Sequence, residues 1–166
     1  MPSKSAFVDK PAIRRAVVAQ LEAELALQVA AANSSRDEAT DPNSQAEGKF
    51  DVRGQSAAYL AAGQSKLAAE IAAAIAAYNS LPLRSFGPGE AVAVGAVVTL
   101  EARGRETVYF LGPARGGLDL EIDGVSVVVI TAASTLGRGL LGQRRGYSIT
   151  LPGRGIPVAQ TIVSVE

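Results

Sequence analysis

Apolar residues recur every three or four positions through much of the first eighty residues, which is the period of an amphipathic helix. Asp9 can cap a first helix, whose early turn tolerates Pro11. The apolar positions of this helix are Ile13, Val17, Leu21, Leu25 and either Gln28 or Val29. A second stripe consists of Leu60, Leu67, Ile71, Ile75 and Tyr78, with Gln64 and Ala74 on the same face. Because neither helix can bury its stripe alone, the pattern predicts an antiparallel helical hairpin, similar to a coiled coil, over residues 1–80.

After residue 90 the pattern changes to short apolar runs separated by turns, which is typical of strands. The expected strands are Val94–Glu101, Thr107–Leu111, Leu118–Ile122, Val125–Thr131, Tyr147–Leu151 and Pro157–Val165. Asp123-Gly124 is a strong signal for a two-residue hairpin turn. Ser134 can cap one short helix that ends at Leu141. Residues 91–166 are therefore expected to form an α+β domain of five or six antiparallel strands around one helix.

The composition supports this division of the chain. Of the 30 alanines, 22 lie in residues 1–80, whereas 14 of the 17 glycines follow residue 80. Alanine is the best helix former, and glycine is common in turns. Residues 81–90 contain two prolines and two glycines and are interpreted as the linker between the two domains.

The charged and reactive residues exclude several classes of function. The chain has no histidine and no cysteine, so it has no Ser-His-Asp triad, no cysteine nucleophile and no zinc site of the usual kind. Sixteen basic and sixteen acidic side chains cancel, which argues against binding to nucleic acid or membrane through the overall field. No apolar stretch is long enough to span a bilayer. We expect a soluble, cytoplasmic protein with no membrane partner.

Acidic residues gather between the two expected helices, near residues 37–51, and they are Asp37, Glu38, Asp41, Glu47 and Asp51. If the second helix starts near Glu47, that residue and Asp51 are one turn apart on one face. Such a pair can hold a hard divalent cation through oxygen ligands, although two carboxylates alone bind weakly. The alternative is a solvated loop whose charges keep it soluble.

Ser134 and a group of arginines in the second half of the chain each have a structural explanation as well as a functional one. Ser134 has no base positioned to activate it as a nucleophile, and helix capping explains it. Three arginines, Arg138, Arg144 and Arg145, lie around the short helix and its following turn. They suit contact with an acidic protein surface or nucleic acid, and equally a solvated basic face.

The segment around the short helix resembles a known family. Its core, Ser134-x-Leu136-Gly137-Arg138-x-Leu140-Leu141-Gly142, is similar to the C-terminal domain of Gre-type bacterial transcription elongation factors. The similarity extends to Tyr109-Phe-Leu-Gly-Pro-x-x-Gly-Gly-Leu118 and to Glu47-x-Lys-Phe-Asp-x-Arg-Gly54, and so covers most of residues 45–165.

This resemblance implies an N-terminal coiled coil and a C-terminal domain of the FKBP-like fold. It implies that the C-terminal domain docks on RNA polymerase at its secondary channel, through Ser134, Leu136, Gly137, Arg138, Arg144 and Arg145. The coiled coil would bring Asp41, Glu47 and Asp51 to the polymerase's catalytic Mg²⁺, with Glu47 and Asp51 as shared metal ligands. Nascent RNA and DNA would be met only indirectly. The chain would have no cofactor of its own, and it would act in trans rather than as an enzyme alone.

The tip departs from the family pattern, in which the sequence is Asp-x-x-Glu-Asn. Aligning Glu47 with the family glutamate places Ser44 at the aspartate and Gly48 at the asparagine. Two alternatives follow from this difference: a channel-binding paralogue that inhibits or tunes the polymerase, and an interaction module whose hairpin binds another protein or a second copy of itself.

Overall fold

The computed structural model describes residues 7–40, 42, 52–152 and 155–166. The chain divides into two compact units. The first unit joins Met1–Val17 to Ala77–Glu166, and the second is Val18–Ala76. No helix in the described ranges has the length and apolar character needed to cross a membrane.

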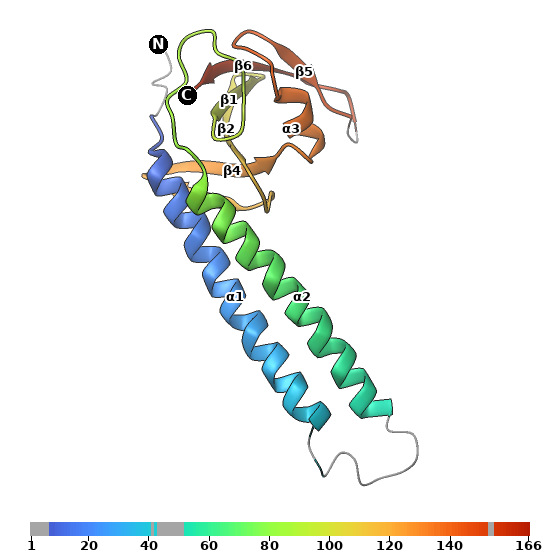
Figure 1. Ribbon diagram of the computed structural model, residues 1–166. Helices are drawn as coiled ribbons and strands as arrows, with labels where there is room; N and C mark the ends of the chain where they lie inside the picture. The colour runs from blue at the N-terminus through green and yellow to red at the C-terminus, as the bar shows by residue number, and fades with distance from the viewer. Residues whose placement is uncertain (1–6, 41, 43–51, 153–154) are drawn as a thin grey trace. The chain divides into compact units, whose positions relative to one another are not determined.

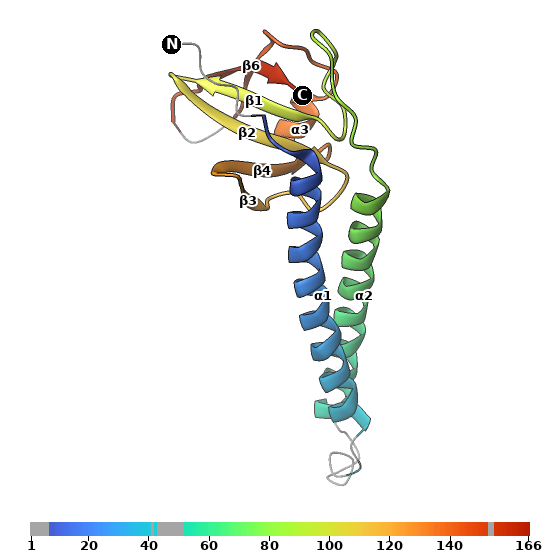
Figure 2. The same cartoon turned by 90° about the vertical axis from the view of Figure 1, so that its left-hand side faces the viewer.

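Two long helices, α1 (Lys10–Thr40) and α2 (Val52–Ser80), lie side by side in Figures 1 and 2. The helical hairpin expected from the sequence is thus confirmed. α1 begins as predicted, because the Asp9 Oδ2 atom accepts a hydrogen bond of 3.1 Å from the backbone N–H of Ala12. Between the helices, the Ser35 hydroxyl donates a bond of 3.1 Å to Gln64 Oε1, and Ser35 is buried.

Most positions of the predicted stripe on α1 are buried. Ile13, Val17 and Leu21 are fully buried. Farther along, the sequence left a choice between Gln28 and Val29. Gln28 is half-buried and Val29 is 44% exposed, so Gln28 continues the inner face.

The stripe on α2 is correct at its C-terminal end and wrong at its start. Ile71 and Tyr78 are fully buried, as expected. Leu60, however, is 55% exposed, whereas Ala57 and Ala61 are buried. In so alanine-rich a helix, small residues can form the contact face, and the larger residue is left outside.

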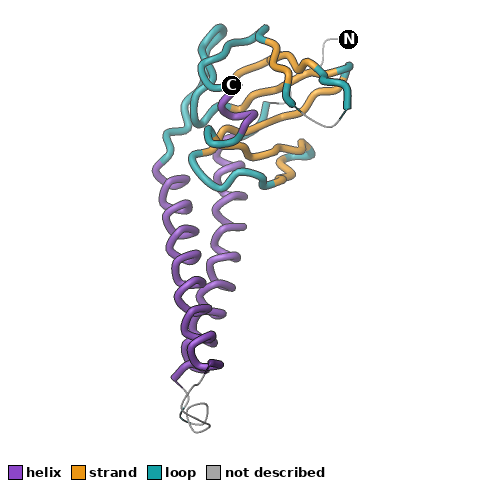
Figure 3. Tube along the Cα trace, turned by 90° about the vertical axis from the view of Figure 1, so that its right-hand side faces the viewer, coloured by secondary structure: helices purple, strands orange, loops and turns teal. Residues whose placement is uncertain are grey.

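The strands form one six-stranded sheet in the order β3-β4-β2-β1-β6-β5. Figure 3 shows these strands in orange. Their bounds are β1 Val97–Ala102, β2 Arg105–Gly112, β3 Asp119–Ile122, β4 Val125–Thr131, β5 Ser148–Thr150 and β6 Ala159–Val165. The short helix α3 (Thr135–Leu140) follows β4. Two helices, a mainly antiparallel sheet and a short helix confirm the predicted α+β class.

One strand pair differs from the expected all-antiparallel arrangement, because β2 and β4 are parallel. The turn between β3 and β4 has positive φ angles at both Asp123 (50°) and Gly124 (80°), as in a type I′ hairpin turn. This tight turn, predicted from the sequence, makes β3 and β4 antiparallel. β4 lies between β3 and β2, and it runs in the same direction as β2.

One face of the sheet carries the main core of the first unit. Its buried residues are Phe86, Val92, Ala96, Val98, Leu100, Leu111, Ile130, Leu140, Ile149 and Ile162. Leu140 brings α3 onto this core, and Phe86 comes from the segment that was interpreted as a linker. That segment therefore contributes to the packing of the sheet.

Candidate functional site

The acidic candidates lie largely where the structure gives no description. Asp41, Glu47 and Asp51 are outside the described residues, so their roles as ligands stay predictions. Asp37 and Glu38 are at the end of α1 and are exposed. Within the described ranges, no group of three or more acidic side chains is placed to hold a metal ion.

Ser134 is fully engaged as a helix cap. Its Oγ atom accepts a hydrogen bond of 3.0 Å from the backbone N–H of Gly137 and donates one of 2.8 Å to the Thr131 carbonyl. The backbone N–H of Ser134 also donates to that carbonyl, at 3.0 Å. These bonds show that Ser134 has a structural role, and they hold the start of α3 against the end of β4.

The glycines of the motif allow α3 to lie close to the sheet. A Cβ atom at Gly137 would overlap the Thr131 carbonyl oxygen and would lie 2.7 Å from its carbon. At Gly139, a Cβ atom would overlap the end of the Ile149 side chain on β5. Leu136 is half-buried and packs against the main core. Much of the motif therefore specifies how the short helix packs.

The three arginines are exposed, and they separate into two places. Arg138 Nη1 donates a bond of 2.8 Å to the Ala133 carbonyl at the start of α3. Arg144 Nη1 donates to the Gly89 carbonyl, 55 positions away in the chain. Arg145 lines a cavity of about 180 Å³ that includes residues 86–90. Two of the three thus lie toward the segment before β1, and the groups that Arg138 and Arg144 bond are uncharged carbonyls.

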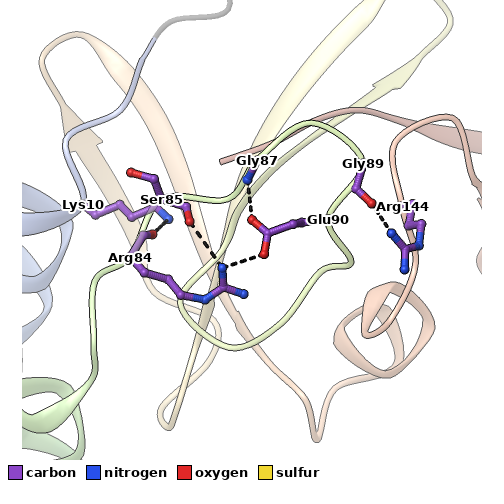
Figure 4. A network of polar contacts seen from close by, with 7 residues as sticks. All are labelled: Lys10, Arg84, Ser85, Gly87, Gly89, Glu90 and Arg144. Atoms are coloured by element: carbon purple, nitrogen blue, oxygen red, sulfur yellow. Dashed lines mark hydrogen bonds and ion pairs between the residues drawn. The ribbon is translucent and has the colours of Figure 1, made fainter.

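A polar network orders this segment, and sequence reasoning missed it (Figure 4). Arg84 Nη1 donates to Glu90 Oε1 at 2.9 Å and to the Ser85 carbonyl at 3.3 Å. The other Glu90 oxygen accepts from the backbone N–H of Gly87. The Gly87 hydrogen bond and the Arg84 side chain hold the pKa of Glu90 below its usual value. The contacts of Glu90 with Arg84 and Gly87 therefore hold residues 84–90 in a closed loop.

Phe86 anchors the same loop in the core. It is 8% exposed, and two cations lie over its ring: Lys10 Nζ at 4.5 Å from the centroid and the Arg84 guanidinium carbon at 3.9 Å. Lys10 Nζ also donates a bond of 2.7 Å to the Arg84 carbonyl. The sequence signal that could have indicated this anchoring role is a large aromatic residue within a proline- and glycine-rich stretch.

Tyr78 joins the end of α2 to the loop after β2. Its hydroxyl donates a hydrogen bond of 2.7 Å to the Ala114 carbonyl, and the side chain is fully buried. Burial raises the pKa of Tyr78 to about 12. A Cβ atom at Gly112 would overlap this hydroxyl, so glycine is required there for the close approach.

Comparisons with known proteins give matches among solved structures. No protein-family model and no curated protein matches the chain. GreA factor homolog 1 (Gfh1) of Thermus thermophilus is 20% identical, with 90% of this chain and 94% of that chain covered and a TM-score of 0.37. Gfh1 of Thermus aquaticus is 22% identical, with coverages of 91% and 92% and a TM-score of 0.40.

A third structure is the prokaryotic transcription elongation factor GreA/GreB from Nitrosomonas europaea. It is 22% identical, with 62% of this chain and 78% of that chain covered and a TM-score of 0.38. These three structures are Gre-related factors, the family that the segment around Ser134 resembles.

Proposed function

We propose that this chain is a transcription elongation regulator that binds RNA polymerase at its secondary channel. The observation that carries this proposal is the segment from Ser134 to Arg145. Its sequence resembles the docking segment of Gre-type factors, and its cap and close packing hold the short helix against the sheet. Arg138 and Arg145 are exposed on it and are suited to an acidic protein surface.

Polymerase capture tests the docking surface directly. The double variant Arg138→Glu with Arg145→Glu is expected to lower capture of core RNA polymerase by at least tenfold at low salt. Arg105→Glu, at the exposed start of β2, is the matched control and should leave capture unchanged. Absence of capture by the wild-type chain at low salt would refute the proposal and favour an interaction module with another partner.

We further propose that Asp41, Glu47 and Asp51 supply oxygen ligands to the magnesium of the polymerase active centre. Carboxylate oxygens are the ligands that Mg²⁺ prefers, and a second metal with its water would support hydrolysis of the transcript's 3′ end. In this role the chain acts in trans and has no metal of its own.

A second candidate is a channel-binding paralogue without cleavage activity. Ser44 and Gly48 favour this second candidate, because Gre-type factors, the family that the chain resembles, have an aspartate and an asparagine at these two positions. A stalled elongation complex separates the two candidates. If the tip acts on magnesium, the wild-type chain stimulates transcript cleavage, and Glu47→Ala with Asp51→Ala abolishes it while polymerase capture is kept. Binding without stimulation supports the paralogue, and unchanged cleavage by the double variant eliminates the metal role.

A further inference from the structure

A cavity of about 240 Å³ lies in the first unit, between the start of α1 and the segment before β1. Its walls are mainly apolar and include Phe7, Val8, Pro11, Leu83 and Phe86. The charged side chains that line it are Asp9, Lys10, Arg84 and Glu166. The cavity therefore combines an apolar interior with a lysine amine.

The Lys10 amine is held in a defined position. It donates to the Arg84 carbonyl at 2.7 Å, and it shares the Phe86 ring with the Arg84 guanidinium. Two like charges over one ring repel each other, although each is attracted to the ring.

Burial of the Lys10 side chain favours the neutral amine. Burial, and secondarily the charge of Arg84, lower the pKa of Lys10 to about 8, while Glu166 opposes this shift. The Asp9 carboxylate caps α1 and pairs with Arg15 at 3.5 Å. A lysine that is desolvated and beside another cation is an activated nucleophile.

We propose that Lys10 is a site of N-acylation by small acyl phosphates, with the acyl group seated in this cavity. The ammonium first loses a proton to water. The amine lone pair then attacks the carbonyl carbon and forms a C–N bond, while the C–O bond to phosphate breaks and phosphate leaves with that electron pair. The second proton is lost from nitrogen to water, which completes the amide.

The amide product can keep part of the contacts that the amine makes. The amide retains one N–H, which can keep the bond to the Arg84 carbonyl. Its loss of charge removes the attraction to the Phe86 ring and to Glu166 together with the repulsion from the Arg84 guanidinium, and the acyl group gains apolar contact with the walls. Nothing in this inference depends on binding to RNA polymerase.

Acetyl phosphate is a suitable probe, with the full chain and site-resolved mass spectrometry across pH 7 to 9.5. At pH 8 a lysine with a pKa of about 8 is about half neutral, whereas an ordinary lysine with a pKa of about 10.4 is below about 1% neutral. Lower nucleophilicity and partial burial offset part of this advantage. We expect initial acetylation at Lys10 to be at least fivefold faster than at the exposed Lys66 at pH 8, and to level off above that pH.

Two variants connect the rate to the cavity. Arg84→Gln removes the neighbouring charge, so acetylation of Lys10 at pH 7.5 is expected to fall about two- to threefold and to level off at a higher pH. Arg105→Gln, exposed at the start of β2, should leave the rate unchanged. A wild-type Lys10 that reacts no faster than Lys66 would overturn the proposal, and so would equal rates in Arg84→Gln and Arg105→Gln.

Discussion

Gly137→Ala is the sharpest test of how α3 is held on the sheet. The new Cβ atom would overlap the Thr131 carbonyl oxygen and would lie 3.0 Å from the Ser134 Oγ atom. Overpacking costs about 1–3 kcal/mol, and loss of the Ser134 cap adds about 1 kcal/mol. The better helix propensity of alanine returns about 1 kcal/mol. The free energy of unfolding is therefore expected to fall by about 1–3 kcal/mol. A change of rotamer cannot relieve the overlap, because the nearest atoms belong to the backbone of Thr131.

Two other glycines give graded controls for this substitution. Gly63 lies on α2 with nothing within 4 Å of a Cβ atom, so Gly63→Ala should stabilise the helix by up to about 1 kcal/mol. Gly139→Ala meets the end of the Ile149 side chain, which can change rotamer. Gly139→Ala should therefore lower the free energy of unfolding by less than Gly137→Ala does. Ile149→Val, which removes the overlapping atom, should reduce that loss further in the double variant.

Thermal unfolding followed by near-ultraviolet circular dichroism reports on the first unit, because three of the four tyrosines lie there. The expected loss for Gly137→Ala corresponds to a decrease in Tm of about 4–12 °C for a domain of about 100 residues. A Tm within 1 °C of the wild-type value would refute the packing argument. Equal losses for Gly137→Ala and Gly139→Ala would also contradict it, since only the first meets backbone.

Two further predictions concern the helices. Tyr78→Phe should lower the free energy of unfolding by about 1–2 kcal/mol near neutral pH, because the Ala114 carbonyl loses its donor. Because burial raises the pKa of Tyr78 to about 12, native stability should fall as pH rises from about 10 toward 12, and this part of the fall should vanish in Tyr78→Phe. Urea unfolding at pH 8 to 12 measures the free energy of unfolding of the wild type and of the variant. Identical pH profiles for the two proteins would refute this prediction. Ile71→Ala should cost about 2–5 kcal/mol and Leu60→Ala less than about 0.5 kcal/mol in urea unfolding, since only Ile71 is buried; similar losses would contradict the assigned inner face.

Local signals in the sequence predicted local structure well. The Asp9 cap, the Asp123-Gly124 turn and the Ser134 cap each depend on bonds or backbone angles within a few residues. The start of the stripe on α2 failed for a reason of composition. In a helix with alanine at so many positions, several faces are apolar, and the period does not select Ala61 over Leu60.

Long-range contacts explain what the sequence did not predict. The parallel pairing of β2 with β4 depends on which strand of the β3–β4 hairpin lies next to β2, and no local pattern encodes that choice. Residues 81–90 are interpreted as a linker from the sequence because prolines and glycines are common in linkers. The order of this segment comes from Lys10, 74 positions from Arg84, and from Arg144, 55 positions from Gly89. The tip carboxylates Asp41, Glu47 and Asp51 lie outside the described residues and stay predictions.

The motif around α3 specifies packing more directly than it specifies a partner. Ser134 and Gly137 are explained by the cap and by the Thr131 carbonyl, and Leu140 by its place in the core. Any chain that places this helix on this sheet needs similar residues, whatever it binds. Arg138 and Arg145 are exposed, and the bond of Arg138 to the Ala133 carbonyl lies at the surface, so both residues can change with little effect on the core. Charge reversal at the two arginines therefore tests mainly the docking surface, whereas a substitution at Gly137 alters the fold and the surface together.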